Sequence, residues 1–131
     1  MRRVIYISRS HVANDPDALD AIVEASSKRN AAADVSGMLW SGPHEFVQAL
    51  EGDYDRVGDT MKRIAADTRH GEIETICDCT VQSRMFGAWS MVRSDAGASC
   101  TASTAYLIGY AGLQRSPAAR RVAELLLSAD D

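Results

Sequence analysis

One apolar stretch of the chain carries a single amide at its centre: Phe46-Val47-Gln48-Ala49-Leu50-Glu51-Gly52. The pattern is typical of a strand. Because strand side chains alternate between the two faces of a sheet, Gln48 shares its face with Phe46 and Leu50. A buried amide without a hydrogen-bond partner costs about 1–3 kcal/mol. We therefore expect a polar group to lie opposite Gln48.

The size and composition are those of one globular domain. The chain has 131 residues, of which 46% are hydrophobic and 24% charged, which allows a single core but not two. Lysine and arginine are dispersed and the net charge is −4, so nucleic-acid binding by phosphate neutralisation is not expected. No apolar run reaches the length of a membrane span or a secretory signal, so no membrane association is expected either.

The cysteines indicate a cellular compartment rather than a metal site. Cys77, Cys79 and Cys100 have no spacing typical of metal ligands. Cys77-Asp78-Cys79 places its two cysteines at alternate positions of one strand. Reduced thiols in a cytoplasmic protein are the simplest interpretation.

Hydrophobic periodicity predicts the order strand, helix, strand, strand, helix, strand, strand. Asp15-Pro16 opens the first helix, since Asp caps and Pro suits the first turn, and Asp53 or Asp55 caps the second. This order predicts an α+β, ferredoxin-like βαββαββ domain, with a five-stranded mixed sheet and two helices on one face. The predicted strands lie around Val4–Ser8, Val35–Trp40, Phe46–Gly52, Glu72–Val81 and Phe86–Val92.

The second face of the sheet needs a cover of its own. Val47 and Ala49 point away from Gln48 and are apolar, yet two helices can cover only one face. We expect residues 1–95 to form the domain proper. Residues 96–131 then form an extension with a helical pair, packed on the second face or shared with another subunit. The apolar second face also predicts a homo-oligomer.

Polar residues predicted to face the helices fit a planar ligand. Tyr6 and Gln48 can oppose each other across adjacent strands, and together they offer a hydroxyl and an amide. A flat ligand edge with several acceptors, slotted between the helices, would satisfy Gln48, Asn30 and Arg69 at once. An isoalloxazine ring is one such ligand, although residue types alone do not select it over another heterocycle.

Six short motifs follow one another along the chain: Val4-Ile5-Tyr6-Ile7-Ser8, Arg29-Asn30, Ser36-Gly37, Phe46–Gly52, Asp67-Thr68-Arg69-His70 and Phe86-Gly87-Ala88-Trp89-Ser90-Met91. Each alone is commonplace. In this order and spacing they resemble the BLUF family of blue-light sensors using flavin, over roughly residues 3–93. The second-strand motif, with Ser36 before Gly37, is a mild variant of the family pattern.

The resemblance implies photochemical roles for four residues. Tyr6 matches the tyrosine that gives an electron and a proton to the excited flavin. Gln48 matches the glutamine that bridges this tyrosine to the ring and changes its hydrogen bonds in the light. Trp89 and Met91 match the pair on the last strand that is tied to signal output.

The resemblance also implies a set of residues that hold the flavin. Beyond Tyr6 and Gln48, these are Asn30, Arg63, Asp67, Arg69, His70 and Arg29. Asn30 matches the asparagine that hydrogen-bonds the carbonyl side of the ring, and the basic residues lie beside the pyrimidine edge or the tail. Arg29 stands where the family often has Asn or His.

The implied function is that of a stand-alone photoreceptor with FAD, or alternatively FMN or riboflavin, that acts through an unidentified downstream protein. It is not expected to be an enzyme, because no paired carboxylates, nucleophile–base arrangement or phosphate loop is apparent. An acylphosphatase-like hydrolase on the same scaffold would need an Arg-bearing phosphate loop. A light-insensitive ferredoxin-like module that binds a small molecule or a protein stays open as the alternative.

Overall fold

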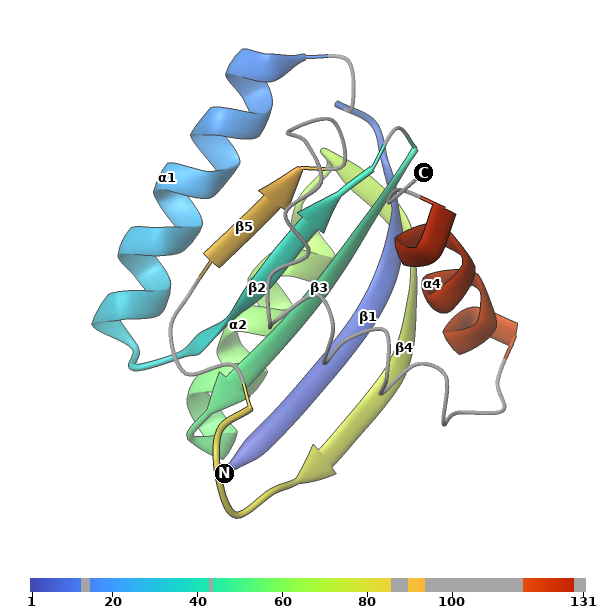
Figure 1. The fold of residues 1–131 in the computed structure, drawn as a ribbon. Helices are drawn as coiled ribbons and strands as arrows, with labels where there is room; N and C mark the ends of the chain where they lie inside the picture. The colour runs from blue at the N-terminus through green and yellow to red at the C-terminus, as the bar shows by residue number, and fades with distance from the viewer. Residues whose placement is uncertain (13–14, 43, 86–89, 94–116, 129–131) are drawn as a thin grey trace.

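The computed structural model describes residues 1–12, 15–42, 44–85, 90–93 and 117–128. The α+β class is confirmed: helices pack on a largely antiparallel sheet of strand order β4-β1-β3-β2-β5 (Figure 1). β1 pairs antiparallel with β3 and β4, and β2 pairs antiparallel with β3 and parallel with β5. The elements are β1 (Arg2–Ser10), α1 (Pro16–Ala32), β2 (Ser36–Ser41), β3 (Glu45–Gly52), α2 (Tyr54–Ala66), β4 (His70–Thr80), β5 (Ser90–Arg93) and α4 (Pro117–Ser128).

The two long helices begin differently. The Asp15 carboxylate accepts a hydrogen bond from the Ala18 N–H at 3.1 Å, and Pro16 is the first helical residue, which confirms the predicted start of α1. Asp53 precedes α2, but its side chain makes no capping hydrogen bond. Asp53 is nevertheless the N-cap residue of α2, one of the two positions predicted, and its backbone carbonyl accepts from the Val57 N–H at 3.0 Å.

Several predicted features of the C-terminal third fall outside the described residues. The last strand was expected from Phe86, whereas the structure describes β5 only from Ser90 and leaves 86–89 undescribed. The apolar stretch 105–113 also lies outside the described residues. The helix expected from Ser116-Pro117 is present as α4. The division of the chain at residue 95 stays a prediction.

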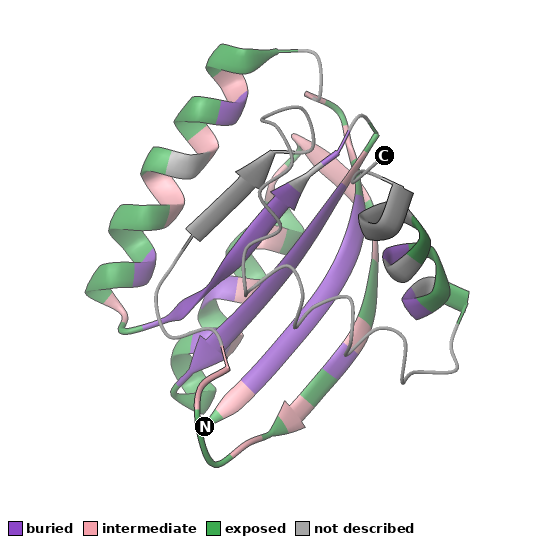
Figure 2. Ribbon diagram, viewed as in Figure 1, coloured by how far each residue is buried: buried purple, intermediate pink, exposed green. Residues whose placement is uncertain are grey.

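The face of the sheet that meets α1 and α2 carries two separate clusters of buried residues. The central strands β1, β2 and β3 are buried along most of their length (Figure 2). Under α2, Val4, Val35, Leu50 and Val57 form one cluster. Under α1, Leu19, Leu39 and Phe46 form another. A helix-covered face usually carries one contiguous core. Here buried polar side chains lie on the same face, among them Tyr6 and Gln48, both at most 5% exposed.

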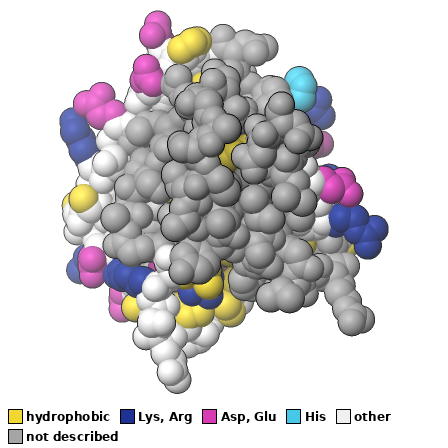
Figure 3. Space-filling model, viewed as in Figure 1, with side chains coloured by type: hydrophobic (Ala, Val, Ile, Leu, Met, Phe, Trp, Pro, Cys, Tyr) yellow, Lys and Arg dark blue, Asp and Glu magenta, His cyan; other side chains and the backbone are white. Residues whose placement is uncertain are grey.

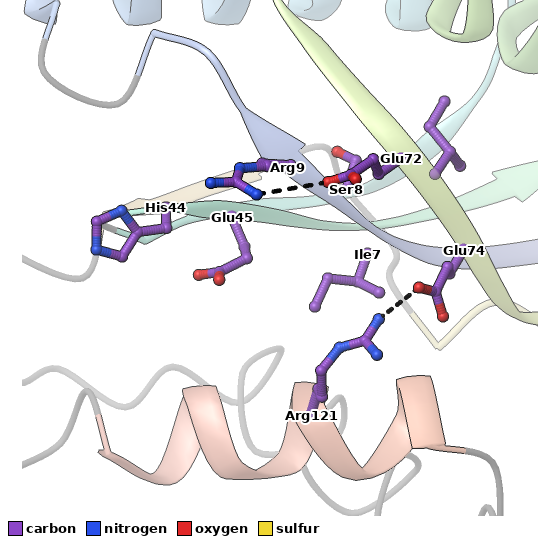
Figure 4. Close-up of a pocket in the computed structure, with 9 residues that line it drawn as sticks. Ile7, Ser8, Arg9, His44, Glu45, Glu72, Glu74 and Arg121 are labelled. Atoms are coloured by element: carbon purple, nitrogen blue, oxygen red, sulfur yellow. Dashed lines mark ion pairs between the residues drawn. The ribbon is translucent and has the colours of Figure 1, made fainter.

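The opposite face is covered in part by α4. Val122 of α4 belongs to the third cluster, with Ile5, Ile7, Met38, Trp40, Val47, Ala49 and Cys77. Arg121 Nη2 lies 2.8 Å from the carboxylate of Glu74, which ties the helix to β4 (Figure 4). A hollow beside this ion pair is lined by charged side chains, and two of them, Arg9 and Glu72, form a second pair at 3.8 Å. Where described residues are visible on the face shown in Figure 3, acidic and basic side chains are interspersed rather than separated.

A buried ion pair holds the end of the sheet together. The Glu51 side chain on β3 is fully buried, and its carboxylate lies 2.8 Å from Arg3 Nη2 of β1. The same carboxylate accepts from the Met85 N–H at 2.9 Å. Arg84 reaches back to the start of β2, donating to Ser36 Oγ at 2.5 Å and to the Asp34 carbonyl at 2.9 Å. The network ties Arg84 and Met85 to this end of the sheet.

Candidate functional site

A groove lies between α1 and α2, over the polar part of the sheet face that separates the two clusters. It consists of two adjoining small hollows, each with an internal volume of about 50 Å³ and partly open to solvent. Residues of α1, β3, α2 and the segment after α2 border both hollows: Ser26, Gln48, Ile64, Asp67 and Arg69. Gln48, the amide singled out by the sequence, therefore lies at the centre of the groove.

Tyr6 and Gln48 form the floor. They are direct partners in the β1–β3 register, and the Tyr6 hydroxyl donates a hydrogen bond to Gln48 Oε1. Burial raises the pKa of the Tyr6 phenol well above its ordinary value, and the nearby charge of Asp67 adds to the effect. Tyr6 is therefore a neutral donor. Because Gln48 Oε1 accepts from Tyr6, its amide nitrogen is left to donate in another direction.

Asn30 supplies a buried donor at the end of α1. The residue is 2% exposed and borders the second hollow. Its side-chain nitrogen Nδ2 is buried without a hydrogen-bond partner in the described part of the chain. A buried donor left unpaired costs about 1–3 kcal/mol. An acceptor for Asn30 Nδ2 is therefore missing at this position of the groove. A ligand carbonyl would supply it.

Asp67 and Arg69 form a tight pair at the rim. Arg69 Nη2 lies 2.5 Å from Asp67 Oδ2, and Arg69 Nε lies 2.9 Å from Oδ1. These hydrogen bonds hold the pKa of Asp67 below its ordinary value. Both side chains are partly exposed and border both hollows. Asp67 thus holds the Arg69 guanidinium in place beside both hollows, and the pair as a whole has no net charge.

Acidification should remove the contribution of this pair. A carboxyl whose pKa is lower in the folded state stabilises the fold above its unfolded pKa, and the effect disappears as the pH falls through the folded value. We expect Asp67→Asn to be less stable than the parent at neutral pH, by less than about 1 kcal/mol because the pair is partly exposed. The difference should begin to shrink as the pH falls below about 4 and vanish only below the folded pKa of Asp67.

Thermal unfolding midpoints across a pH series measure this difference. Asp59→Asn, which changes an exposed carboxylate of α2 outside both hollows, is the matched control. A gap between parent and Asp67→Asn that stays constant down to the lowest pH would contradict the assignment.

His70 closes one side of the groove. Its Nε2 lies 2.7 Å from the Ile64 carbonyl and its Nδ1 lies 2.7 Å from Ser8 Oγ. Because a carbonyl only accepts, Nε2 carries the proton. Both ring nitrogens are thus used within the protein. The ring centroid lies 6.2 Å from that of Tyr6 and 6.2 Å from that of Phe46, so His70 offers a ligand its ring rather than a polar atom.

The structure describes the other expected site residues to different extents. Arg29 and Arg63 are exposed and border the second hollow, with Arg63 Nη2 3.5 Å from Thr60 Oγ1. Trp89 lies outside the described residues. Met91 is placed in β5 by its backbone alone. Its register partner is Leu39, which is also the register partner of Gln48.

The site predicted from the sequence did not include the apolar side chains that line the first hollow. Residues with mainly apolar side chains border the first hollow: Ile22, Leu39, Phe46 and Ile64. Ile22 lies on the inward stripe of the first helix, so helical periodicity placed it towards the sheet. The sequence did contain a signal for these walls. Both predicted helices have apolar residues on the side that faces the sheet, and the same sheet face carries Tyr6 and Gln48. That combination leaves a slot between the stripes.

The groove combines apolar walls, buried amides on its floor and a cation at its rim. This arrangement defines an α+β ligand-binding domain suited to a flat aromatic molecule with polar edges. The chain belongs to the BLUF family, described as sensors of blue-light using FAD, whose family model matches residues 1–92. BLUF domains are flavin-binding sensory modules and not enzymes themselves, although some relatives join them to a cyclase.

Known relatives agree with this assignment. The chain is 34% identical over 88 residues to the blue light- and temperature-regulated antirepressor BluF of Escherichia coli, covering 65% of this chain and 22% of that protein. It is 34% identical over 74 residues to the photoactivated adenylate cyclase subunit beta of Euglena gracilis, covering 56% of this chain and 9% of that protein. The chain thus spans less than a quarter of the length of these relatives.

A solved structure shares the fold. The dark-state structure of BlrB, a BLUF protein, superimposes with a TM-score of 0.65 at 28% identity, covering 71% of this chain and 72% of that one. Within the residues that the structure describes, no helix is long and apolar enough to cross a bilayer. In the same residues, no group of three or more His, Cys, Asp or Glu side chains is arranged to hold a metal ion.

Proposed function

We propose that this chain is a blue-light photoreceptor that binds FAD non-covalently in the groove between α1 and α2. The observation that carries the proposal is the buried Tyr6–Gln48 hydrogen bond beside the unpartnered Asn30 amide. The buried Asn30 Nδ2 donor, which has no partner among the described residues, is costly for the empty fold. A ring edge that both donates and accepts hydrogen bonds offsets that cost.

Some residues of the groove suit the ring of the flavin, and others suit its phosphate-bearing tail. Asn30 Nδ2 and the Gln48 amide nitrogen donate to acceptors on the ring edge. Ile22 and Ile64 pack on the ring faces. Arg63, Arg69 and Arg29 border the open side of the groove, where cations suit the phosphates of FAD or FMN. These three side chains favour a phosphorylated flavin over riboflavin.

The photochemistry begins at Tyr6. When bound, the flavin absorbs blue light and becomes a strong electron acceptor. Burial keeps Tyr6 a neutral phenol, so loss of its electron must be accompanied by loss of its proton. The hydrogen bond to Gln48 Oε1 gives that proton a defined route. With a flavin bound, Tyr6 would regain its electron and proton, and Gln48 would be left in a new orientation or tautomer.

The output passes along the sheet. Gln48 pairs with Leu39 of β2, and Leu39 pairs with Met91 of β5. A reoriented amide changes hydrogen bonds worth about 0.5–1.5 kcal/mol each. A coupling of about 1–3 kcal/mol changes an affinity 5- to 150-fold, which is enough to redirect an unidentified downstream protein. We propose that β5 and the C-terminal extension carry this change, and that the chain forms a homo-oligomer.

The first test is the chromophore itself. The purified protein should be yellow, and the pigment released by denaturation should be FAD by chromatography against FAD, FMN and riboflavin standards. Recovery of colourless protein that takes up no added flavin would contradict the proposal. It would support instead a light-insensitive module on the same fold.

Tyr6→Phe separates binding from photochemistry. The variant removes only the hydroxyl and should still bind flavin, but blue light should produce no reversible red shift of its absorption. Tyr54→Phe is the matched control, since Tyr54 is 60% exposed, and it should respond like the parent. A normal shift in Tyr6→Phe would remove this residue from the mechanism.

Asn30→Ala tests the unpartnered donor. Loss of one neutral hydrogen bond, about 0.5–1.5 kcal/mol, should weaken flavin affinity about 2- to 12-fold. Titration of flavin-stripped protein, followed by fluorescence quenching, measures the change. Ser27→Ala changes an exposed α1 residue outside both hollows and should leave affinity unaltered. Equal affinities for Asn30→Ala and the parent would mean that Asn30 does not contact the ligand.

A further inference from the structure

Two cysteines of β4 lie side by side on the sheet face away from the groove. Cys77 Sγ and Cys79 Sγ are 3.2 Å apart. Cys77 is 6% exposed and belongs to the cluster that contains Val122 of α4, and Cys79 is partly buried against that cluster. No part of the proposed photochemistry uses either thiol.

Strand geometry explains why the two thiols share a face. Residues two apart in a strand point to the same side, with Cα atoms about 6.6 Å apart. The register adds a local irregularity: Ile5 pairs with Cys77 and Tyr6 pairs with Thr75, so Ile76 is an extra residue in β4. Such a bulge bends the strand that contains it. Cys77 and Cys79 thus lie directly after the irregularity in β4, and their sulfur atoms are already in contact.

We propose that Cys77 and Cys79 form a redox-modification site that hydrogen peroxide converts to a disulfide within β4. Cys79 is the first to react because its side chain is the more exposed. Its sulfur takes one oxygen from the peroxide to give a sulfenic acid and releases water. Cys77 Sγ then attacks the Cys79 sulfur, the S–S bond forms, and the hydroxyl leaves as a second water with the Cys77 proton. Two electrons pass from the two thiols to one peroxide.

The same geometry makes the disulfide easy to reduce. A Cα separation of about 6.6 Å lies at the upper end of the range for disulfides, about 4.4–6.8 Å, and departures from ideal geometry store strain. Strained disulfides have more oxidising potentials and are the labile ones. The site should therefore rest as a dithiol in a reducing cytosol and oxidise only while peroxide is present. The bond would also remove the hydrogen bond from Cys77 Sγ to the Arg3 carbonyl, 3.7 Å long.

Peptide mapping of the unmodified chain tests the proposal. Trypsin cleavage after Arg69 and Arg84 gives one peptide, 70–84, that contains both cysteines, while Cys100 falls in another. After peroxide treatment, peptide 70–84 should lose two hydrogens and resist alkylation. Reduced glutathione should restore both thiols. Two alkylatable thiols in peptide 70–84, under conditions that oxidise free glutathione in the same tube, would overturn the proposal.

A trapping experiment tests the order of the steps. In Cys77→Ser the resolving thiol is absent, so a dimedone-type probe should label Cys79 strongly after peroxide treatment. In the parent chain Cys77 should suppress that label at least several-fold. Equal labelling of Cys79 in the two proteins, or a disulfide that glutathione does not reduce, would contradict the site as proposed. Neither readout requires flavin or light, so failure here and failure of the photoreceptor proposal are distinguishable.

Discussion

Gln48→Leu is expected to bind flavin yet show no light-induced red shift. Leucine has about the volume of glutamine but neither donor nor acceptor, so the Tyr6 hydroxyl loses its hydrogen-bond acceptor, which receives the proton in the proposed mechanism. The ring edge loses its switchable partner at the same time. Absorption spectra before and after blue light should therefore coincide in the variant.

Two controls make this result specific. Gln82→Leu makes the same chemical change at an exposed position outside both hollows, and its red shift should equal that of the parent. Flavin content, measured from the ratio of visible to ultraviolet absorption, should be similar in all three proteins. A full red shift in flavin-loaded Gln48→Leu would show that another residue produces the signal.

Glu51→Ala is expected to have the largest effect on stability. The variant leaves the guanidinium of Arg3 without its carboxylate in a site where Arg3 is 8% exposed and Glu51 fully buried. It also removes the acceptor of the Met85 N–H. Breaking a buried ion pair from one side costs about 3–5 kcal/mol. That is a large share of the 5–15 kcal/mol of stability typical of a domain.

Urea denaturation followed by far-ultraviolet circular dichroism measures this loss. Glu24→Ala breaks the exposed Glu24–Lys28 pair within α1, whose side chains are 73% and 76% exposed. It should cost only about 0.3–0.5 kcal/mol. If Glu51→Ala were no more destabilising than Glu24→Ala, the network would not hold the loop before β5.

Strand alternation predicted the floor of the site. It placed Tyr6 and Gln48 on the helix-facing side, and the structure makes them register partners joined by a hydrogen bond. The start of α1 was equally predictable, because capping depends on a few adjacent residues. Asn30 by itself is an ordinary residue at a helix end, and the family resemblance gave it a defined role beside the carbonyl side of the ring.

Several side-chain contacts between residues far apart in the sequence could not be predicted from the sequence. Nothing local to His70 indicates that its ring bridges Ser8 of β1 and the Ile64 carbonyl of α2. The partner of Glu51 is Arg3, 48 positions away, and only the β1–β3 register brings the two together. The apolar walls likewise come from helices whose separation the sequence does not define. Periodicity predicts which face is buried, but not the space left between two elements.

The central claim is that light changes the hydrogen bonds of one amide beside a bound flavin. The most direct measurement is the light-minus-dark absorption spectrum of the purified, flavin-loaded chain. We predict a red shift of the flavin bands under blue light that reverses fully in darkness. A flavin-loaded protein whose spectrum stays unchanged, or bleaches without recovery, would contradict this account.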